Sequence, residues 1–200
     1  MTTFEDLKEL LKADRSTRRF DASRKVSEEK LKNLIELTRY CASGRNAQPL
    51  KYIIVASPER CKKVYPLLKW AGYYTEWEGP APEERPVAYL IQCLDTQYGK
   101  DCLCDDGLQL QAITLGATTL GLRGCIIKAF NAPELSKDLN IPPEYTPRYV
   151  LALGYPAEVI SLEDMPDDDE ADFKYYRTPD GTHHVPKRPL SSLIIDSDPD

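Results

Sequence analysis

Residues 102–130 read CLCDDGLQLQAITLGATTLGLRGCIIKAF, a long apolar segment followed by a shorter one. Apolar side chains are spread nearly all round a helix over residues 102–122, which predicts a helix that is buried on almost every side. Small residues in it would let another backbone approach closely: Gly107, Ala112, Gly116 and Ala117. Gly121 is expected to end this helix, and residues 125–130 are expected to form the next strand.

Further helices and strands are predicted on both sides of this segment. Apolar runs bounded by turn residues predict three strands, at residues 52–56, 87–93 and 149–153. Side chains that can cap a helix precede four other predicted helices: Thr3, Ser27, Ser57 and Asn131. We expect the first of these helices to end near Asp14, the second near Gly44 and the third at Pro66.

The order of these elements predicts an α+β or mixed three-layer fold, because helices outnumber strands and do not alternate strictly with them. The length suits one domain over residues 1–200. Residues 73–86 lack periodicity and are expected to form a loop that borders a site. Residues 157–200 are acidic, rich in proline and poorly periodic until the apolar residues 189–195. We interpret them as an irregular segment that ends in an arm.

The composition argues against several classes of protein. A formal net charge of −6 disfavours nucleic acid as the main partner, because phosphate binding draws on an excess of Lys and Arg. No apolar run is long enough to span a bilayer, and charged residues occupy residues 1–11, where a signal peptide would be apolar. We therefore expect a cytoplasmic protein without a membrane partner. A classical dinucleotide-binding domain and a P-loop are disfavoured, since neither glycine-rich motif is present.

The cysteines and histidines do not predict a metal site. The six cysteines form no C-x-x-C pair and accompany no secretory signal, so reduced thiols are expected. Three of them lie in apolar stretches and are interpreted as small core residues: Cys41, Cys93 and Cys125. The spacing of Cys102 and Cys104 with the two histidines fits no structural zinc pattern. His183 and His184 are adjacent in a polar segment and are expected to be exposed.

Three separate segments carry groups suited to an anionic, ring-bearing cofactor. Residues 15–20 read RSTRRF, whose guanidinium groups and hydroxyls can bind a phosphate by charge-assisted hydrogen bonds. Residues 43–49 read SGRNAQP, whose amides can both donate and accept hydrogen bonds at the edge of a flavin ring. Residues 187–191 read KRPLS and supply a second basic pair. Each segment alone is common on solvated loops, and their order and spacing together are more specific.

With these three segments the chain resembles the nitroreductase family. In that family an R-S-x-R-x-F segment, an S-x-x-N-x-Q-P segment before the first strand and a basic C-terminal segment surround FMN. The resemblance continues through residues 105–120, the turn GLRGC at 121–125 and the strand end LALGYP at 151–156, so that it covers nearly the whole chain.

The resemblance implies a three-layer α+β fold with a mixed, mostly antiparallel sheet flanked by helices. It also implies a homodimer with FMN at the subunit interface, a C-terminal arm that packs on the partner, and NAD(P)H as the electron donor. By the match of motifs, the residues expected to bind FMN are Arg15, Ser16, Arg18, Ser43, Asn46, Gln48, Lys128, Ala129, Lys187 and Arg188. No side chain is expected to be catalytic and no metal is expected, because the flavin carries the chemistry.

The activity implied is a two-electron transfer from NAD(P)H to a flat, electron-poor small molecule such as a nitroaromatic or a quinone, in a ping-pong sequence. Lys128 and Ala129 occupy the segment that the resemblance places beside the reactive atom of the flavin, where relatives often have an acidic residue or glycine. Two alternatives remain open. The enzyme could reduce or dehalogenate a specific metabolite or act on flavin itself, or the chain could bind flavin without turnover.

Overall fold

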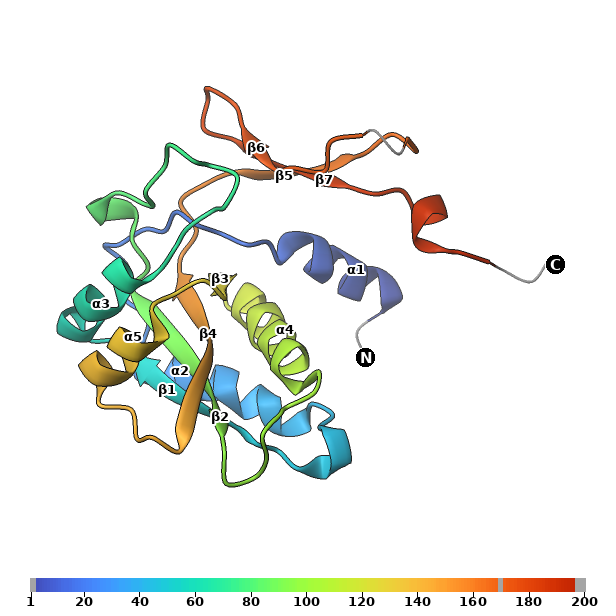
Figure 1. The fold of residues 1–200 in the computed structure, drawn as a ribbon. Coiled ribbons are helices and arrows are strands. Elements are labelled where there is room, and N and C mark those ends of the chain that lie inside the picture. Colours follow the sequence, from blue (N-terminus) through green and yellow to red (C-terminus); the bar gives the residue numbers. More distant parts are fainter. Residues whose placement is uncertain (1–2, 169–170, 197–200) are drawn as a thin grey trace.

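The computed structural model describes residues 3–168 and 171–196, and its centre is a four-stranded antiparallel sheet (Figure 1). The strands lie in the order β1 (Leu50–Val55), β2 (Ala88–Asp95), β4 (Tyr145–Gly154) and β3 (Arg123–Ile127). Every residue of β2 is buried, as expected for an apolar strand in the interior of a sheet with both faces covered. The four predicted strands are confirmed, with ends that differ by a few residues.

Helices cover both faces of this sheet, so that the predicted three-layer arrangement is confirmed (Figure 1). On one face, α2 (Glu28–Glu36) and α4 (Asp105–Thr119) pack through Leu34, Leu110 and Ile113. On the other face, α3 (Pro58–Val64) and α5 (Ala132–Leu139) pack through Val64 and Leu135. Successive strand residues point to opposite faces, and each face therefore has a core of its own.

The predicted helix caps are confirmed. Thr3 and Asp6 form a capping box at the start of α1 (Phe4–Ala13), and Ser27, Ser57 and Asn131 each accept a hydrogen bond from a backbone N–H three residues on. The second helix is shorter than predicted, since α2 ends at Glu36 and a 3-10 turn, η1 (Leu37–Tyr40), follows it. The third ends as expected, because Pro66 lies in the 3-10 turn η3 (Tyr65–Leu67) that follows α3.

The prediction that the long helix is buried on almost every side is wrong. In α4 the inward residues are buried, but Leu108 is 44% exposed and Leu120, just after the helix, is 41% exposed. Besides the sheet, η1, α1 and α2 contact this helix and leave part of its surface exposed. We call the exposed surface of α4 and its flanking turns the α4 face, and its apolar residues are Leu37, Tyr40, Leu103, Leu108 and Leu120.

Residues 157–200 are more regular than predicted, because a second sheet of three short strands lies within them. Its order is β5 (Ile160–Asp164), β7 (His183–Lys187) and β6 (Tyr176–Arg177), with β5 parallel and β6 antiparallel to β7. The strands are short and largely polar, so their sequence carries little periodicity. Figure 1 shows this sheet beside α1, and the 3-10 turn η5 (Leu190–Leu193) projecting beyond it.

Two further 3-10 turns lie near the sites described below, η2 (Gly44–Asn46) and η4 (Pro82–Glu84). In the part of the chain that the structure describes, no helix combines the length and the apolar character needed to cross a bilayer.

Candidate functional site

The first basic segment crosses the edge of the main sheet and is held there by backbone contacts. The N–H of Thr17 donates to the carbonyl of Gly124 in β3 (3.0 Å), and the N–H of Phe20 donates to the carbonyl of Glu84 (2.8 Å). The ring of Phe20 packs against Gly154, where an added Cβ would lie 2.9 Å from a ring carbon. These contacts fix the backbone directly after Ser16 and on both sides of Arg18.

Arg15 and Lys187 come from the two ends of the chain and line one groove with Leu11 and Leu162. A guanidinium nitrogen of Arg15 donates to the carbonyl of Leu11 (2.9 Å), while its buried Nε has no partner among the described residues. The pKa of Lys187 is lowered, first by its partial burial and second by the positive charge of Arg15. Two neighbouring cations of this kind favour an anion between them.

A cleft of about 140 Å³ adjoins Arg15 on the side of α4. It is lined by Asp14, Arg15, Ser16, Gln111, Thr114, Gly124 and Ile126. The carboxylate of Asp14 is already engaged, because it accepts hydrogen bonds from the side chains of Gln111 (2.6 Å) and Thr114 (2.7 Å). The hydroxyl of the exposed Ser16 and the unpartnered Nε of Arg15 therefore remain available to a ligand.

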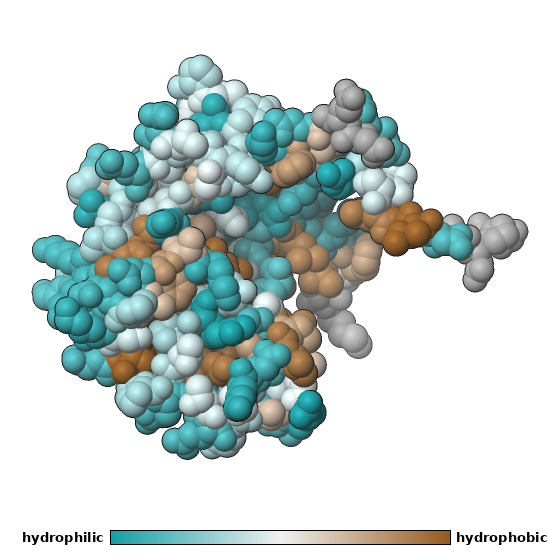
Figure 2. Space-filling view, viewed as in Figure 1, coloured by the Kyte–Doolittle hydropathy of each residue, from teal (hydrophilic) through white to brown (hydrophobic). Residues whose placement is uncertain are grey.

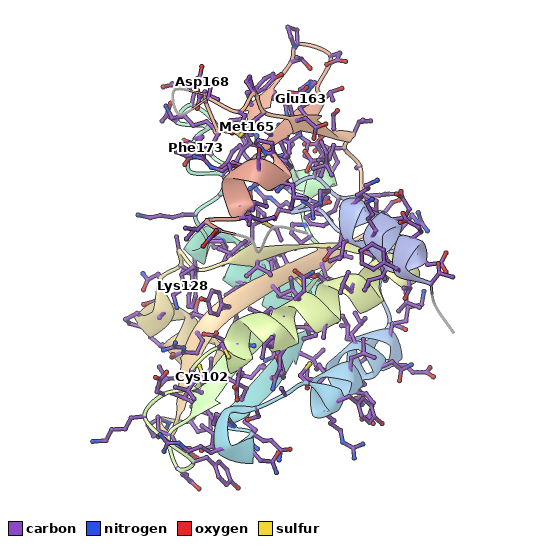
Figure 3. All side chains as sticks on the ribbon, turned by 90° about the vertical axis from the view of Figure 1, so that its right-hand side faces the viewer. Cys102, Lys128, Glu163, Met165, Asp168 and Phe173 are labelled. Atoms are coloured by element: carbon purple, nitrogen blue, oxygen red, sulfur yellow. The ribbon has the colours of Figure 1, made fainter. Side chains whose placement is uncertain are left out.

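β3, the edge strand of the sheet, forms one wall of this cleft through Gly124 and Ile126. Side chains alternate along a strand, so that Gly124, Ile126 and Lys128 lie on the side that faces α4. Four residues of strand span about 13 Å. The ammonium group of Lys128 lies 4.2 Å from the centre of the Tyr149 ring, and Figure 3 shows this lysine at the end of the strand. An elongated ligand could therefore extend from Arg15 to Lys128.

Ala129 contributes its backbone to another hollow. Its carbonyl accepts a hydrogen bond from the N–H of Lys69 (2.9 Å). The residue lines an open depression of about 550 Å³ with residues 66–69, Phe130 and Asn131. Lys128 and Ala129 thus lie between the β3 cleft and this depression.

The side chain of Arg18 is turned away from the cleft of Arg15. Its guanidinium group donates to the carbonyl of Ser16 (3.3 Å), lies 3.1 Å from Nε2 of His183 and sits 4.7 Å above the ring of Tyr175. It therefore contacts the C-terminal sheet, whereas Arg15 and Ser16 line the cleft. Arg188, which follows Lys187, lies 5.9 Å from the ring of Phe173 and does not line the groove of Arg15.

The prediction that the histidines are exposed is wrong for His183, which is 2% exposed. Its Nδ1 lies 2.5 Å from the hydroxyl of Tyr74 and its Nε2 faces Arg18. Burial, together with the positive charges of Arg18 and Arg177, lowers the pKa of His183 to about 4. The neighbouring His184 points to the other side of β7, is half-buried and pairs with Glu163. Side chains alternate along a strand, so a strand predicted over residues 183–187 would have placed His183 and His184 on opposite sides.

Glu158 is a residue that the sequence did not indicate. Its side chain is 1% exposed, and its carboxylate accepts hydrogen bonds from the backbone N–H groups of Arg18 (2.5 Å) and Arg19 (3.1 Å). It also forms an ion pair with Arg177 (2.6 Å). This carboxylate therefore ties the first basic segment to the C-terminal sheet. Nothing in its sequence neighbourhood distinguishes it from other surface glutamates.

The amide segment lies at the start of α4, apart from the basic segments. Asp105 accepts hydrogen bonds from the hydroxyl of Ser43 (2.6 Å) and the N–H of Gly44 (2.9 Å). The same hydroxyl accepts from the N–H of Gln48 (2.9 Å), and the Gln48 amide donates to the side chain of Asn46 (3.0 Å). Within one chain, these residues are not brought together with Arg15.

The separation can be estimated along α4. Arg15 lies in the cleft that Gln111 and Thr114 line, six to nine residues beyond Asp105, which corresponds to about 9–13 Å of helix. The amide segment is also conformationally unusual, because Arg45, Asn46 and Gln48 all have positive φ values (54°, 56° and 48°). Such backbone costs on the order of 1 kcal/mol or more for each residue that is not glycine, and it clusters at ligand sites.

The histidines and cysteines do not form a metal centre in the part of the chain that the structure describes, where no three His, Cys, Asp or Glu side chains gather suitably. Cys93 and Cys125 are buried as predicted, whereas Cys41 is only half-buried.

Comparisons with known proteins agree with this geometry. Residues 11–87, which include the first basic segment and the amide segment, match the model of the nitroreductase family. A relative from Bacillus subtilis, provisionally named the NAD(P)H nitroreductase YdgI, is 25% identical over 187 residues, with 76% of this chain and 90% of the relative covered. A relative from Methanothermobacter thermautotrophicus, provisionally named an NADH dehydrogenase/NAD(P)H nitroreductase, is 26% identical over 175 residues, with 82% and 84% covered.

Solved structures show the same fold. A nitroreductase family protein from Streptococcus pneumoniae superposes with a TM-score of 0.67 over 96% of this chain and 100% of its own, at 18% identity. A protein described as an FMN-dependent nitroreductase from Clostridium difficile gives a TM-score of 0.61 over 74% of this chain and 87% of its own, at 19% identity. The chain has the nitroreductase fold, and its residues 11–87 match the model of the nitroreductase family.

Proposed function

We propose that this protein is an FMN-dependent oxidoreductase that transfers two electrons from NAD(P)H to a flat, electron-poor acceptor such as a nitroaromatic or a quinone. The observation that carries the proposal is the meeting of Arg15 and Lys187 at one end of the cleft along β3. The names of the two relatives, both NAD(P)H nitroreductases, support the choice of donor. A ping-pong sequence follows if the donor and the acceptor use the same side of the cleft in turn.

The groups at the Arg15 end fit a phosphate. Arg15 has a buried Nε without a partner, Lys187 adds a second positive charge and Ser16 adds a hydroxyl. The acid nearest to them, Asp14, is satisfied by Gln111 and Thr114 and therefore repels an anion less than a free carboxylate would. We propose that these three residues hold the FMN phosphate, with Arg188 adding charge from the rim.

The β3 end of the cleft fits a planar ring. Ile126 offers an apolar side chain at the edge strand, and Lys128 offers a cation beyond it. Bound FMN would supply the two-electron chemistry, while the chain orients it and sets the local charge. We propose that the ammonium group of Lys128 lies near the bound ring and stabilises the negative charge that the ring gains when it is reduced. Ala129 contributes its backbone between this position and the neighbouring depression.

The distance between the amide segment and Arg15 supports a homodimer. We propose that Ser43, Asn46 and Gln48 of one chain complete the flavin site of the other, because in their own chain they lie at the far end of α4. The exposed α4 face offers apolar surface that a second copy would bury. Figure 2 shows further apolar side chains on the projecting tail, where Leu190, Leu193, Ile194 and Ile195 are exposed. We propose that this tail packs on the partner.

Steady-state kinetics of the purified protein test the proposal. We expect NADH or NADPH to be oxidised when a quinone or a nitroaromatic compound is supplied, with parallel lines in double-reciprocal plots as the mark of a ping-pong sequence. Flavin-free protein should be inactive and should regain activity when FMN is added. Tight FMN binding without any turnover would instead favour a flavin-binding protein that is not an enzyme.

A further inference from the structure

A second cleft of about 480 Å³ lies where β1 ends and β2 begins. It is lined by residues of α3, of the loop that carries η4 and of the start of β2, together with Ala22 and Lys25. It shares no lining residue with the cleft of Arg15, and the strand order places β1 and β3 at opposite edges. Its volume lies in the range of small-molecule sites.

Tyr89 lies at the floor of this cleft with a polar atom that has no partner. Its side chain is fully buried, and its hydroxyl forms no hydrogen bond with the described residues. Burial raises the pKa of Tyr89, and the positive charge of Arg85 opposes that shift only in part. The hydroxyl is therefore a neutral donor. Burying a hydroxyl without a partner is unfavourable, which indicates that this group serves a ligand that enters the cleft.

The cleft is also electropositive. Lys25, Lys62 and Arg85 line it, and no aspartate or glutamate does. Among the described residues none of these three cations forms an ion pair. The Nε of Arg85 is buried without a partner, and its guanidinium group lies 3.9 Å above the ring of Tyr65. This stacking fixes the plane of the guanidinium group and leaves its edge free to bind a carboxylate.

The remaining walls are small and apolar. They consist of Ala22, Ala56, Pro58, Cys61, Pro82, Pro86 and Val87, and the Cys61 thiol is engaged by the carbonyl of Val87 (3.5 Å). Proline rings and alanine methyl groups present flat surfaces without hydrogen-bonding groups, and such surfaces suit a planar ring better than a flexible polar chain. The ligand that matches all three features is planar, apolar in its body and negatively charged at one end.

We propose that this cleft binds a small aromatic carboxylate, with its ring between the proline and alanine walls and its carboxylate bound by Arg85 and the hydroxyl of Tyr89. Lys25 and Lys62 attract the anion from the rim. The site is separate from the cleft proposed for FMN and does not depend on that assignment. It offers the protein a place to bind an aromatic acid away from the residues assigned to electron transfer.

Isothermal titration of the full-length, flavin-loaded protein with benzoate tests this proposal. We expect benzoate to bind with a dissociation constant of about 1 mM or lower, and the neutral isostere benzamide to bind at least about tenfold more weakly. Arg85→Gln should weaken benzoate binding about tenfold or more. Lys62→Gln should weaken it by less, and Lys63→Gln should leave it unchanged, because Lys63 is exposed on the same helix and does not line the cleft.

Tyr89→Phe separates binding from folding. Since the hydroxyl has no partner in the protein, its removal should leave the thermal midpoint equal to that of the wild type or higher, while it weakens benzoate binding about tenfold. Absence of benzoate binding to the wild type would overturn the proposal. Unchanged benzoate affinity in both Arg85→Gln and Tyr89→Phe would also overturn it. A simultaneous shift of the flavin absorbance would then show that benzoate binds at the flavin.

Discussion

Nε2 of His183 lies 3.1 Å from a guanidinium nitrogen of Arg18. Arginine can only donate, so Nε2 accepts this hydrogen bond and the ring proton resides on Nδ1, which donates to the hydroxyl of Tyr74. His183 is therefore neutral. The C-terminal sheet thus holds the side chain of Arg18, as Glu158 holds its backbone. The first basic segment is positioned by residues that lie about 140 to 165 positions away in the chain.

The neutral state of His183 predicts a loss of stability in mild acid. The pKa of His183 is about 4 in the folded protein, whereas an ordinary histidine has a pKa of 6.5. Between pH 6.5 and pH 4, His183 is therefore protonated in the unfolded chain and neutral in the folded protein. The free energy of unfolding should therefore be unaffected by this group above pH 6.5 and should fall by up to about 1.4 kcal/mol for each pH unit below it. Urea titrations between about pH 7 and pH 5 measure this slope.

His183→Gln is the matched variant, because the amide can still bond Arg18 or Tyr74 and does not titrate. The slope in this variant should be smaller than in the wild type over the same interval. Equal slopes would mean that another group titrates there, and the assignment of a neutral, buried His183 would be wrong.

Arg15→Ala should weaken FMN binding about ten- to hundredfold, since one charge-assisted hydrogen bond to a phosphate contributes about 1.5–3 kcal/mol. Lys137→Ala is the control, because Lys137 is an exposed cation that pairs with Glu134 on the same helix, α5, on the other face of the sheet. Titration of FMN into the flavin-free proteins gives the affinities. Arg18→Ala should also weaken FMN binding, and it should lower the thermal midpoint because the contacts with His183 and Tyr175 are lost. Wild-type affinity in Arg15→Ala would remove the main support for the phosphate site.

Glu158→Gln should destabilise the protein by about 2–4 kcal/mol. The substitution keeps the size of the side chain but leaves the positive charge of Arg177, which is 14% exposed, without its partner. It also replaces a charged acceptor for the N–H groups of Arg18 and Arg19 by a neutral one. Glu163→Gln, on the neighbouring strand, is a more exposed control and should cost less. A Glu158→Gln variant as stable as the wild type would show that this carboxylate does not hold the two parts together.

Much of the fold could be predicted from the sequence because its signals are local. Ser27, Ser57 and Asn131 cap helices by contacts within three residues. Each of the strands β1, β2, β3 and β4 can be recognised from the apolar run of its own residues. The exposure of Leu108 and Leu120 could not be predicted, because apolar residues spread round a helix do not show which part of the chain covers each side.

The candidate site was predictable only in part. The motifs indicated Arg15 and Lys187, and the structure brings them together. They did not indicate that Arg18 turns toward His183, nor that Glu158 is buried, because both depend on the pairing of β5 with β7. That pairing joins short polar strands whose partners are far apart in the sequence, and no local pattern records it.

The exposed α4 face predicts that the protein is a dimer and that the dimer completes the site. Leu108→Glu should produce monomers, because it introduces a charge into apolar surface that a partner would bury, and it should weaken FMN binding in parallel. Val159→Glu is a matched control, since Val159 is an exposed apolar residue just before β5 and away from α4. Light scattering at micromolar concentration reports the mass. A wild-type monomer that binds FMN would contradict both the dimer and the shared site.

We propose that a flavin bound between Arg15 and Lys128 carries electrons from a nicotinamide to an acceptor. The most direct test of this proposal is an anaerobic titration of the FMN-loaded protein, followed by flavin absorbance. We predict that NADH or NADPH bleaches the yellow colour, and that a quinone or nitroaromatic compound, added after the donor is used up, restores it. A protein that binds no FMN, or a bound flavin that neither NADH nor NADPH bleaches, would contradict this electron transfer.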